Sequence, residues 1–326
     1  MNTMRAVRVS ATGGPEMLEV AEVPVPTPGA TQARVRLEAS GINFIDTYFR
    51  RGLYPMALPA ILGQEGAGIV EAVGDAVTTC AVGDRVVFAV GAAAAYAQQV
   101  VIDQAHLVRV PEGVPSDLAC ASMLQGMTAH YLVHGAFMLG PAHTALVHAA
   151  AGGTGQLLVQ LAKRTGARVI GTVSSAAKAA IASSVGCDHV VRYDQDDFVA
   201  AARAFTDGRG VEVVYDGVGA KTFDGSLRAL ARRGTCVLFG QASGPVGPFD
   251  PQLLNQRGSL FLTRPKLQDY IATRAELEAR ASDVLGAVRD GALRVEIGGR
   301  WPLAQAADAH RALESGGTTG KLLLMP

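Results

Sequence analysis

The stretch Leu146-Val-His-Ala-Ala-Ala-Gly-Gly-Thr-Gly155 decides the fold of this chain. It begins inside the apolar run 144–147, which predicts a buried strand, and it ends in glycines. Residues 156–163 follow with apolar side chains at helical spacing. A strand, a glycine turn and a helix in this order predict the first half of a dinucleotide-binding unit.

The glycines suit that role for physical reasons. The motif is A-x-G-x-x-G, with Ala150 in the place of the usual first glycine. Gly152 would let the backbone approach a pyrophosphate, and Gly155 would let the helix pack closely on the strand. The helix N-terminus would offer N–H groups to the phosphates. A tight turn without a ligand is the alternative, so the residues that follow must decide.

Short apolar runs and helical patterns alternate after this turn. The predicted strands are 168–173, 189–193, 211–215, 235–239 and 259–263, and the predicted helices are 176–184, 197–205 and 221–230. Together with 144–147 they predict a doubly wound, six-stranded parallel sheet, a Rossmann fold.

The end of the second strand, Gly171-Thr-Val-Ser-Ser-Ala-Ala-Lys178, indicates which cofactor is preferred. It lacks the acidic residue that would hold the ribose 2′-hydroxyl of NAD. Ser174, Ser175 and Lys178 would instead attract a 2′-phosphate, and Tyr193 would add a hydroxyl or a ring face. We therefore expect NADPH, while a solvated helix position remains the alternative for Lys178.

Composition excludes several function classes. The 326 residues predict two domains, and 29 basic against 29 acidic residues leave no net charge and no basic stripe for nucleic acid. No apolar stretch is long enough to span a bilayer, and the N-terminus lacks a signal-peptide pattern, so we expect a cytoplasmic protein. The cysteines are scattered, without a close pair: Cys80, Cys120, Cys187 and Cys236. This pattern predicts reduced thiols, and His130 with His134 predicts a plain helical face, so no metal site is expected.

The first third of the chain is different. Residues 4–10, 32–39, 66–74, 84–90, 97–102 and 107–110 predict short strands of a compact antiparallel β domain. Helices from Ser116 through 123–137 lead to the first strand of the parallel sheet. Helices at 275–290 and 304–314 and a strand at 321–325 are expected to return to the β domain. The expected domains are therefore 1–124 with 264–326, and 125–263.

These parts, in this order, resemble the medium-chain dehydrogenase/reductase superfamily, with a GroES-like domain before the nucleotide-binding domain. The match is sharpest at residues 41–54, 62–70, 148–155 and 263–265. These segments resemble the zinc-independent NADPH:quinone oxidoreductases, the group that includes zeta-crystallin. Zinc-dependent relatives have a cysteine ligand in the place of Asn43 and Gly-His-Glu in the place of Gly63-Gln-Glu65. Since the glutamine amide does not replace an imidazole ligand, the resemblance implies an oxidoreductase without a metal.

The resemblance also implies site residues. Asn43, Tyr48, Tyr54 and Arg264 are the catalytic candidates, because hydride transfer to a quinone needs hydrogen bonds to the developing oxyanion. Ordinary packing beside Phe44 and Phe49 is the alternative for the tyrosines, and an ion pair is the alternative for Arg264. Asp46 is a weaker candidate for orienting a neighbour. The implied cofactor-binding residues are Asn43, Thr128, Gly152, Gly153, Gly155, Gly171, Ser174, Lys178, Tyr193, Val218, Phe239, Gly240, Phe261, Thr263 and Lys321.

Thr128 is expected early in the helix that leads into the cofactor domain, and His148 is expected to be a hydrogen-bonded strand-end residue. The leading hypothesis is an NADPH:quinone reductase acting on small quinones. An NADPH-dependent reductase of enone or alkenal C=C bonds is the first alternative, and a non-catalytic NADPH-binding structural or RNA-binding protein is the second. The apolar strand 259–263 predicts a homodimer through the last strand of the sheet, as in relatives.

Overall fold

The computed structural model describes residues 2–90 and 93–326, which form two compact units. Unit 1 contains Met1–Met127 and Ile271–Pro326, and unit 2 contains Thr128–Tyr270. Among the described residues, no helix combines the length and the apolar character needed to cross a membrane.

Unit 2 is built on a six-stranded sheet in the order β11-β10-β9-β12-β13-β14. The strands are β9 (Thr144–Val147), β10 (Arg168–Val173), β11 (His189–Arg192), β12 (Val211–Asp216), β13 (Leu230–Leu238) and β14 (Phe261–Thr263). Every neighbouring pair is parallel, which confirms the predicted Rossmann sheet. The chain runs outward from β9 to β11 and then returns to β12, so β9 and β12 flank the switch point at which such folds bind ligands.

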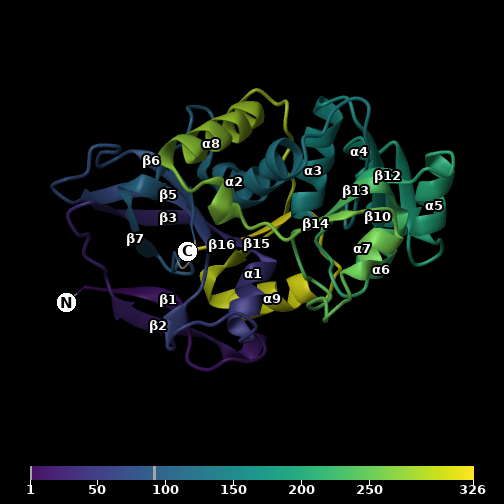
Figure 1. The fold of residues 1–326 in the computed structure, drawn as a ribbon. Helices are drawn as coiled ribbons and strands as arrows, with labels where there is room; N and C mark the ends of the chain where they lie inside the picture. The colour runs from purple at the N-terminus through teal and green to yellow at the C-terminus, as the bar shows by residue number, and fades with distance from the viewer. Residues whose placement is uncertain (1, 91–92) are drawn as a thin grey trace. The chain divides into compact units, whose positions relative to one another are not determined.

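Helices cover both faces of this sheet. They are α3 (Gly153–Arg164), α4 (Ala176–Ser184), α5 (Phe198–Phe205), α6 (Phe223–Ala229) and the short α7 (Gln252–Gln256), and a 3-10 helix follows at Leu267–Tyr270. Right-handed crossovers place α3 and α4 on one face and α5 and α6 on the other. α5 packs against α6, and Figure 1 shows α3 and α6 on opposite sides of the sheet. Leu146, Ile170 and Val214 of the sheet share one buried core with residues of α5 and α6.

The helix start expected at Ser116 is confirmed, but the expected place of Thr128 early in a helix is wrong. α2 spans Ser116–Tyr131, and a π-helical turn follows at Leu132–Ala136. No proline separates Ser116 from Tyr131, and the single Gly126 does not interrupt the helix. Thr128 therefore lies near the end of α2.

Unit 1 contains the predicted β domain. Its larger sheet has the order β15-β16-β3-β5-β6-β8, with β7 also paired to β3, and a second sheet has the order β2-β1-β4. The strands are β1 (Thr3–Val9), β2 (Leu18–Pro24), β3 (Gln32–Ile42), β4 (Ala60–Ile61), β5 (Glu65–Val73), β6 (Arg85–Ala89), β7 (Gln99–Asp103), β8 (Val108–Arg109), β15 (Ile297–Pro302) and β16 (Lys321–Met325). Ala33, Val35 and Leu37 of β3 are buried while the charged residues between them are not, as the period-2 pattern predicted.

The C-terminal segment is an integral part of unit 1. β16 pairs antiparallel with β3, so that Leu322 lies opposite Ile42. The helices of this unit, besides most of α2, are α1 (Phe44–Arg50), α8 (Arg274–Arg289) and α9 (Ala306–Glu314), with 3-10 helices at Pro15–Met17, Gln104–His106 and Leu303–Gln305. The sequence had not predicted α1, β2, β4 or β15.

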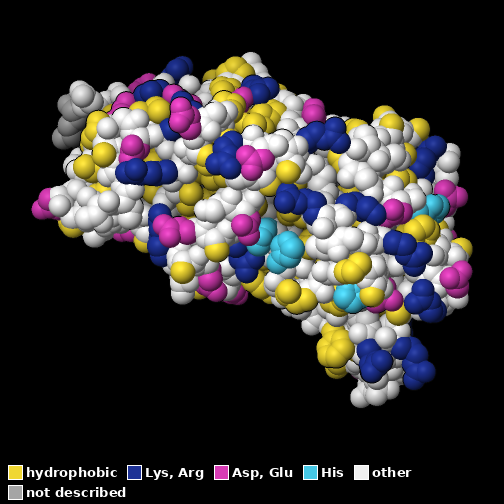
Figure 2. Space-filling view, turned by 90° about the horizontal axis from the view of Figure 1, so that it is seen from above, with side chains coloured by type: hydrophobic (Ala, Val, Ile, Leu, Met, Phe, Trp, Pro, Cys, Tyr) yellow, Lys and Arg dark blue, Asp and Glu magenta, His cyan; other side chains and the backbone are white. Residues whose placement is uncertain are grey.

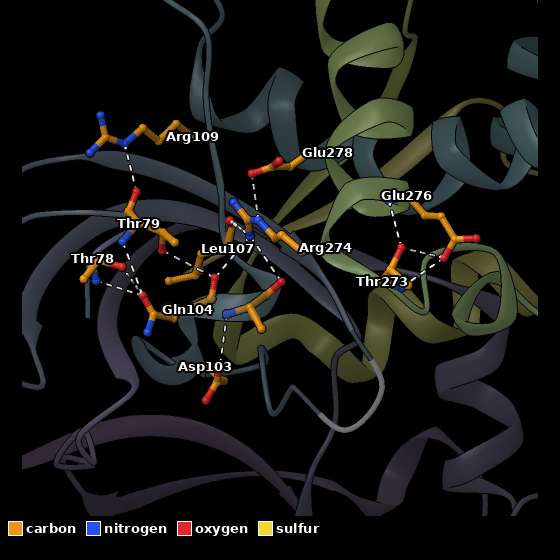
Figure 3. A network of polar contacts seen from close by, with 11 residues as sticks. Thr78, Thr79, Asp103, Gln104, Leu107, Arg109, Thr273, Arg274, Glu276 and Glu278 are labelled. Carbon is orange, nitrogen blue, oxygen red and sulfur yellow. Dashed lines mark hydrogen bonds and ion pairs between the residues drawn. The ribbon is translucent and has the colours of Figure 1, made fainter. Parts of the chain in front are cut away.

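Arg274 fastens α8 to the β domain (Figure 3). Its Nη1 donates to the carbonyl oxygens of Gln104, Ala105 and Leu107 at 3.1, 3.2 and 2.6 Å, and its Nε donates to Glu278 at 2.8 Å. The amide oxygen of Gln104 in turn accepts the backbone N–H of Thr78 at 2.8 Å. A single guanidinium thus satisfies three carbonyl groups around the 3-10 helix that follows β7.

Candidate active site

Asn43 begins the first helix of unit 1. It directly follows β3 and is the N-cap residue of α1. Its backbone N–H donates to Oδ2 of Asp46 at 2.9 Å, so the Asp46 carboxylate closes the first turn of the helix. Both residues are buried. The start of α1 is therefore fixed by a buried carboxyl group.

The side chain of Asn43 belongs to a buried cluster with Glu65 and Lys321. Asn43 Nδ2 donates to Glu65 Oε1 at 2.7 Å, and Lys321 Nζ donates to Asn43 Oδ1 at 2.7 Å. Lys321 also forms an ion pair with Glu65 Oε1, and Glu65 Oε2 accepts the backbone N–H of Leu124 at 2.8 Å. The side chains of Lys321 and Glu65 are 1% and 0% exposed, so the pair is shielded from water.

Three neighbouring strands bring this cluster together. β3 lies between β16 and β5, and Asn43 follows its last residue, while Lys321 and Glu65 are the first residues of β16 and β5. Gly41 makes the space, because a Cβ there would lie 2.2 Å from Glu65 Oε1. The same strand order explains how residues 278 positions apart in sequence come into contact.

The two candidate tyrosines lie close to this cluster in sequence. Tyr48 is a buried residue of α1, and its ring packs edge-on against Tyr54, with the centroids 5.5 Å apart. Tyr54 also packs edge-on against Phe49 at 5.5 Å. The aromatic packing that was the alternative for Tyr54 is therefore present. The catalytic roles of both hydroxyls stay predictions.

The glycine turn of unit 2 has the geometry that a pyrophosphate needs. Gly152 is the N-cap of α3 and has no side chain to cap the first turn, which leaves N-terminal N–H groups for an anion. A Cβ on Gly155 would lie 2.2 Å from the Ala149 carbonyl oxygen, so only glycine fits there. The residues present thus fit a dinucleotide cofactor.

The predicted 2′-phosphate contacts follow two adjacent strands. Ser174 and Ser175 come after β10, and Tyr193 comes after β11 and is 47% exposed. Because β10 and β11 are parallel neighbours, these residues leave the sheet at the same edge. Ser175 caps α4 by accepting the Lys178 N–H at 3.3 Å, and partial burial lowers the pKa of the Lys178 ammonium. Gly171 is needed for packing, because a Cβ would lie 2.6 Å from Cys187 Sγ.

Asp216 organises the switch-point edge and was not predicted. Its Oδ1 accepts the backbone N–H groups of Val218 and Gly219, each at 2.9 Å. Both of its oxygens lie 2.8 Å from the Thr222 hydroxyl, and Oδ2 accepts the Ser226 hydroxyl at 2.7 Å. This buried carboxylate therefore fixes the Gly217-Val218-Gly219 turn, which contains the predicted cofactor residue Val218.

His148 connects the hydrogen bonds of Asp216, through Ser226, to the ends of β9 and β10. Its Nδ1 lies 2.8 Å from the Thr172 hydroxyl and its Nε2 lies 3.0 Å from the Ser226 hydroxyl. Burial lowers the pKa of His148, against the opposing charge of Asp216. The expectation of a hydrogen-bonded strand-end histidine is confirmed, and the network ties β9, β10 and α6 together.

The other predicted residues are distributed between the two units. Phe239 and Gly240 follow β13, Phe261 and Thr263 lie in β14, and Gly153 begins α3. Arg264 is an exposed residue after β14 and belongs to unit 2, whereas Asn43 and both tyrosines belong to unit 1. No single unit therefore brings all four catalytic candidates together.

Glu65 and Asp216 are the main residues that sequence reasoning missed. Each is an acidic residue at one end of a mostly apolar strand. A carboxylate in such a position must be hydrogen-bonded or paired, and this was the available signal. Within residues 2–90 and 93–326, no group of three His, Cys, Asp or Glu side chains has the arrangement of a metal site.

Two family models match the chain. The alcohol dehydrogenase GroES-like domain matches residues 29–143, and the zinc-binding dehydrogenase domain matches residues 153–281. These matches agree with the β domain of unit 1 and the Rossmann sheet of unit 2. Fold and site together define a medium-chain dehydrogenase/reductase.

Individual relatives narrow the class. A quinone oxidoreductase of Pseudomonas aeruginosa is 44% identical, over 99% of both chains. The quinone oxidoreductase of Escherichia coli, solved in complex with NADPH, is 41% identical with a TM-score of 0.96, over 99% of this chain and 100% of that one. A 2-haloacrylate reductase of a Burkholderia species is 39% identical, over 98% of both chains. The chain belongs to the quinone oxidoreductase family.

Proposed function

We propose that this protein is an NADPH-dependent quinone oxidoreductase that reduces small quinones. The observation that carries the proposal is the buried cluster of Asn43, Glu65 and Lys321. Asn43 and Glu65 belong to the segments in which zinc-dependent relatives have metal-ligand motifs, and Lys321 of β16 adds an ammonium. An oxyanion formed on the substrate can be stabilised by such preorganised donors.

The nucleotide is assigned to unit 2. Gly152, Gly153, Gly155 and the N-terminus of α3 would hold the pyrophosphate, while Ser174, Lys178 and Tyr193 would hold the 2′-phosphate. When bound, NADPH supplies the hydride. In this proposal residues 125–263 are the NADPH-binding domain, and residues 1–124 with 264–326 are the catalytic domain.

The chemistry left to the protein is electrostatic. Two of the three N–H groups of the Lys321 ammonium point to Asn43 Oδ1 and Glu65 Oε1, and we assign the third to the developing oxyanion. Glu65 holds the ammonium in place, so little reorganisation is needed during the reaction. Tyr48, Tyr54 and Arg264 remain candidate donors to the same oxygen, and a tyrosine hydroxyl or water would supply the proton.

A steady-state assay tests this function. NADPH and NADH are compared as donors against 1,4-benzoquinone and an enone, with and without a chelator. The expected result is quinone reduction that is faster with NADPH than with NADH and is not changed by the chelator. Turnover of the enone alone would favour C=C reduction, which the 2-haloacrylate reductase relative makes the second candidate.

Lys178→Ala tests the cofactor preference. Loss of a charge-assisted hydrogen bond to the 2′-phosphate should raise the Michaelis constant for NADPH about tenfold. The Michaelis constant for NADH should stay the same, because NADH has no 2′-phosphate. An unchanged constant for NADPH would remove Lys178 from the cofactor site.

We also infer a cytoplasmic homodimer without a nucleic-acid partner. β14 is an edge strand of the unit 2 sheet, and its Phe261 side chain is 61% exposed, which favours pairing with a second copy. On the face drawn in Figure 2, Lys and Arg side chains are interspersed with Asp and Glu. Sedimentation as a monomer would contradict the dimer, and salt-sensitive RNA retention on a filter would contradict the absence of nucleic acid.

A further inference from the structure

A second polar network in unit 1 connects Asp46 to Arg50 through two buried residues. Asp46 Oδ2 lies 3.1 Å from the Tyr96 hydroxyl, which lies 2.9 Å from His310 Nε2. His310 Nδ1 lies 2.8 Å from Arg50 Nη1. The first three residues are 0% exposed and Arg50 is 1% exposed. The network joins α1, the segment before β7, and α9.

The chemistry of arginine fixes the direction of every hydrogen bond in this network. A guanidinium can only donate, so His310 Nδ1 must accept and the imidazole must carry its proton on Nε2. Nε2–H then donates to the Tyr96 oxygen, and the Tyr96 hydroxyl donates to Asp46. Burial lowers the pKa of His310 to about 3, with the charge of Arg50 acting in the same direction, so the imidazole stays neutral.

The network is not a path for proton transfer to solvent. Its outer end is Arg50, whose guanidinium does not release a proton in proteins. Arg50 Nη2 donates to both oxygens of Glu314 at 2.8 and 2.9 Å, and this ion pair holds the guanidinium in place. The network therefore acts by orientation rather than by conduction.

We propose that Tyr96 and His310 are positioning residues for the oxidoreductase reaction: they hold Asp46 as an acceptor at the start of α1, and so fix Asn43 and the charge beside Lys321. Asp46 Oδ2 receives both the Asn43 N–H and the Tyr96 hydroxyl. This inference rests on the proposed function, because it gives Asn43 and Lys321 their roles.

The other oxygen of Asp46 gives the network a second property. Oδ1 is buried and has no hydrogen-bond partner among the described residues. Burial raises the pKa of Asp46 to about 7, although the Asn43 N–H, the Lys321 charge and the Tyr96 hydroxyl oppose the shift and Glu65 adds to it. The groups near Asp46 are thus Lys321 of β16, Glu65 of β5, Tyr96, and His310 with Arg50. Asp46 changes its charge near neutral pH.

The charge of Asp46 should affect the reaction. Ionised Asp46 adds a second carboxylate beside the Lys321–Glu65 pair, and this negative charge opposes an oxyanion. We therefore expect kcat for quinone reduction to fall as the pH rises through about 7. Removing the Tyr96 hydroxyl, which donates to Asp46, should shift this fall in kcat to higher pH.

Infrared titration of the Asp46 carboxyl is the direct test, because it does not depend on turnover. Asp46→Asn assigns the band of the protonated carboxyl by removing it. Tyr96→Phe removes only the hydroxyl, and the titration midpoint should rise by about one pH unit, as expected for the loss of a hydrogen bond to a charged group. Tyr215→Phe is the matched control, since Tyr215 is a buried tyrosine of unit 2 whose hydroxyl donates to the Leu132 carbonyl at 3.1 Å. Its midpoint should equal that of the unmodified protein.

Two substitutions of His310 separate its role as a hydrogen-bond donor to Tyr96 from its role in packing. His310→Gln places an amide near the former Nε2 and keeps a donor for Tyr96, so the Asp46 midpoint should stay near its original value. His310→Asn is too short to reach Tyr96, so the Tyr96 hydroxyl keeps its proton but loses the N–H that orients it, and the midpoint should rise by only part of the Tyr96→Phe shift. Equal midpoints for the two variants would overturn the directional role of His310.

The same variants are compared in the pH profile of kcat with NADPH and 1,4-benzoquinone. The proposal is supported if the fall in kcat of Tyr96→Phe shifts to higher pH together with the infrared midpoint. An unshifted infrared midpoint in that variant overturns it, whether or not quinone is reduced. A shifted midpoint in a protein that reduces neither quinone nor enone supports the coupling of Tyr96 to Asp46 but overturns the proposed function.

Discussion

Each of the two units buries an aspartate, and the two carboxylates differ in how fully they are hydrogen-bonded. Asp216 of unit 2 receives donors on both oxygens, all of them backbone N–H groups or hydroxyls. Asp46 of unit 1 receives two donors on Oδ2 and none from the described residues on Oδ1. Only Asp46 has an oxygen free to take a proton without losing a bond.

This difference suits what each unit is proposed to do. A nucleotide cradle needs a fixed backbone, and Asp216 fixes the turn at residues 217–219 through two N–H groups. A site that stabilises a transient anion depends on the balance of charge, which Asp46, Glu65 and Lys321 set together. Unit 2 thus uses a carboxylate for geometry, and unit 1 uses its carboxylates for charge.

The largest effect is expected when the cation of unit 1 is removed. Lys321→Met leaves Glu65 buried without its counter-charge, which should lower the free energy of unfolding by about 3–5 kcal/mol. Chemical denaturation at neutral pH measures this loss. Adding Glu65→Gln removes the unpaired charge, so the double variant should recover much of the stability. No recovery would show that Lys321 stabilises the protein through packing.

The pH dependence of stability tests Asp46. Its pKa is about 7 in the folded protein against an ordinary value of 3.8, so the folded state binds the proton more tightly. Its contribution is therefore fully present below about pH 4 and is lost as the pH rises to about 7. Relative to Asp46→Asn, the unmodified protein should lose up to about 1.4 kcal/mol per pH unit across this range.

His310 also makes the stability depend on pH in this range, and its contribution must be separated from that of Asp46. The pKa of His310 in the folded protein is about 3, below its ordinary value of 6.5, so its contribution to stability is lost as the pH falls through this range. Both proteins contain His310, and its slope cancels in their difference. A difference that does not vary between pH 4 and 7 would contradict a raised pKa for Asp46.

Asp216→Asn should lower the stability of the protein by removing hydrogen-bond acceptors. The new NH2 group would face donors that need an acceptor, and the protein should lose about 2 kcal/mol of stability. NADPH affinity, measured by fluorescence titration, should fall as well, because the turn at residues 217–219 loosens. Unchanged stability together with unchanged NADPH affinity would show that the turn does not depend on the Asp216 carboxylate.

Two glycine substitutions give the smallest effects, and they should have opposite signs. Gly155→Ala forces a Cβ against the Ala149 carbonyl oxygen, which should cost about 1–2 kcal/mol and weaken NADPH binding. Gly286 lies within α8 of unit 1, and a Cβ there would meet nothing within 4 Å. Gly286→Ala should therefore stabilise the protein by about 0.5–1 kcal/mol. Thermal denaturation compares the two variants.

Local patterns in the sequence were sufficient for most of the parallel sheet. β9 and β10 have the predicted bounds, because short apolar runs between glycine turns have few alternatives. α1 was not predicted, since its seven residues mix aromatic and charged side chains and its N-cap interaction needs the carboxylate of Asp46. The sequence also placed Thr128 early in a helix, whereas it lies near the end of α2.

The site was predictable only in part for the same reason. Asn43 and Lys321 followed from family resemblance, but their partner Glu65 did not, because an ion pair across 256 positions leaves no local pattern. Tyr96, His310 and Arg50 come from three separate segments, and nothing in their spacing indicates that they meet. Their relation is a property of the folded sheet and helices.

The place of Lys321 on β16 has a consequence for how the protein forms on the ribosome. Unit 2 is one continuous segment, Thr128–Tyr270, and can begin to fold once that segment has emerged. Unit 1 lacks β16 until translation has passed residue 321. Glu65 and Asn43 therefore have no contact with the Lys321 ammonium while the intervening chain is synthesised. The nascent polypeptide should therefore acquire its nucleotide fold well before its catalytic cluster, and a ribosome stalled before codon 321 should carry the first without the second.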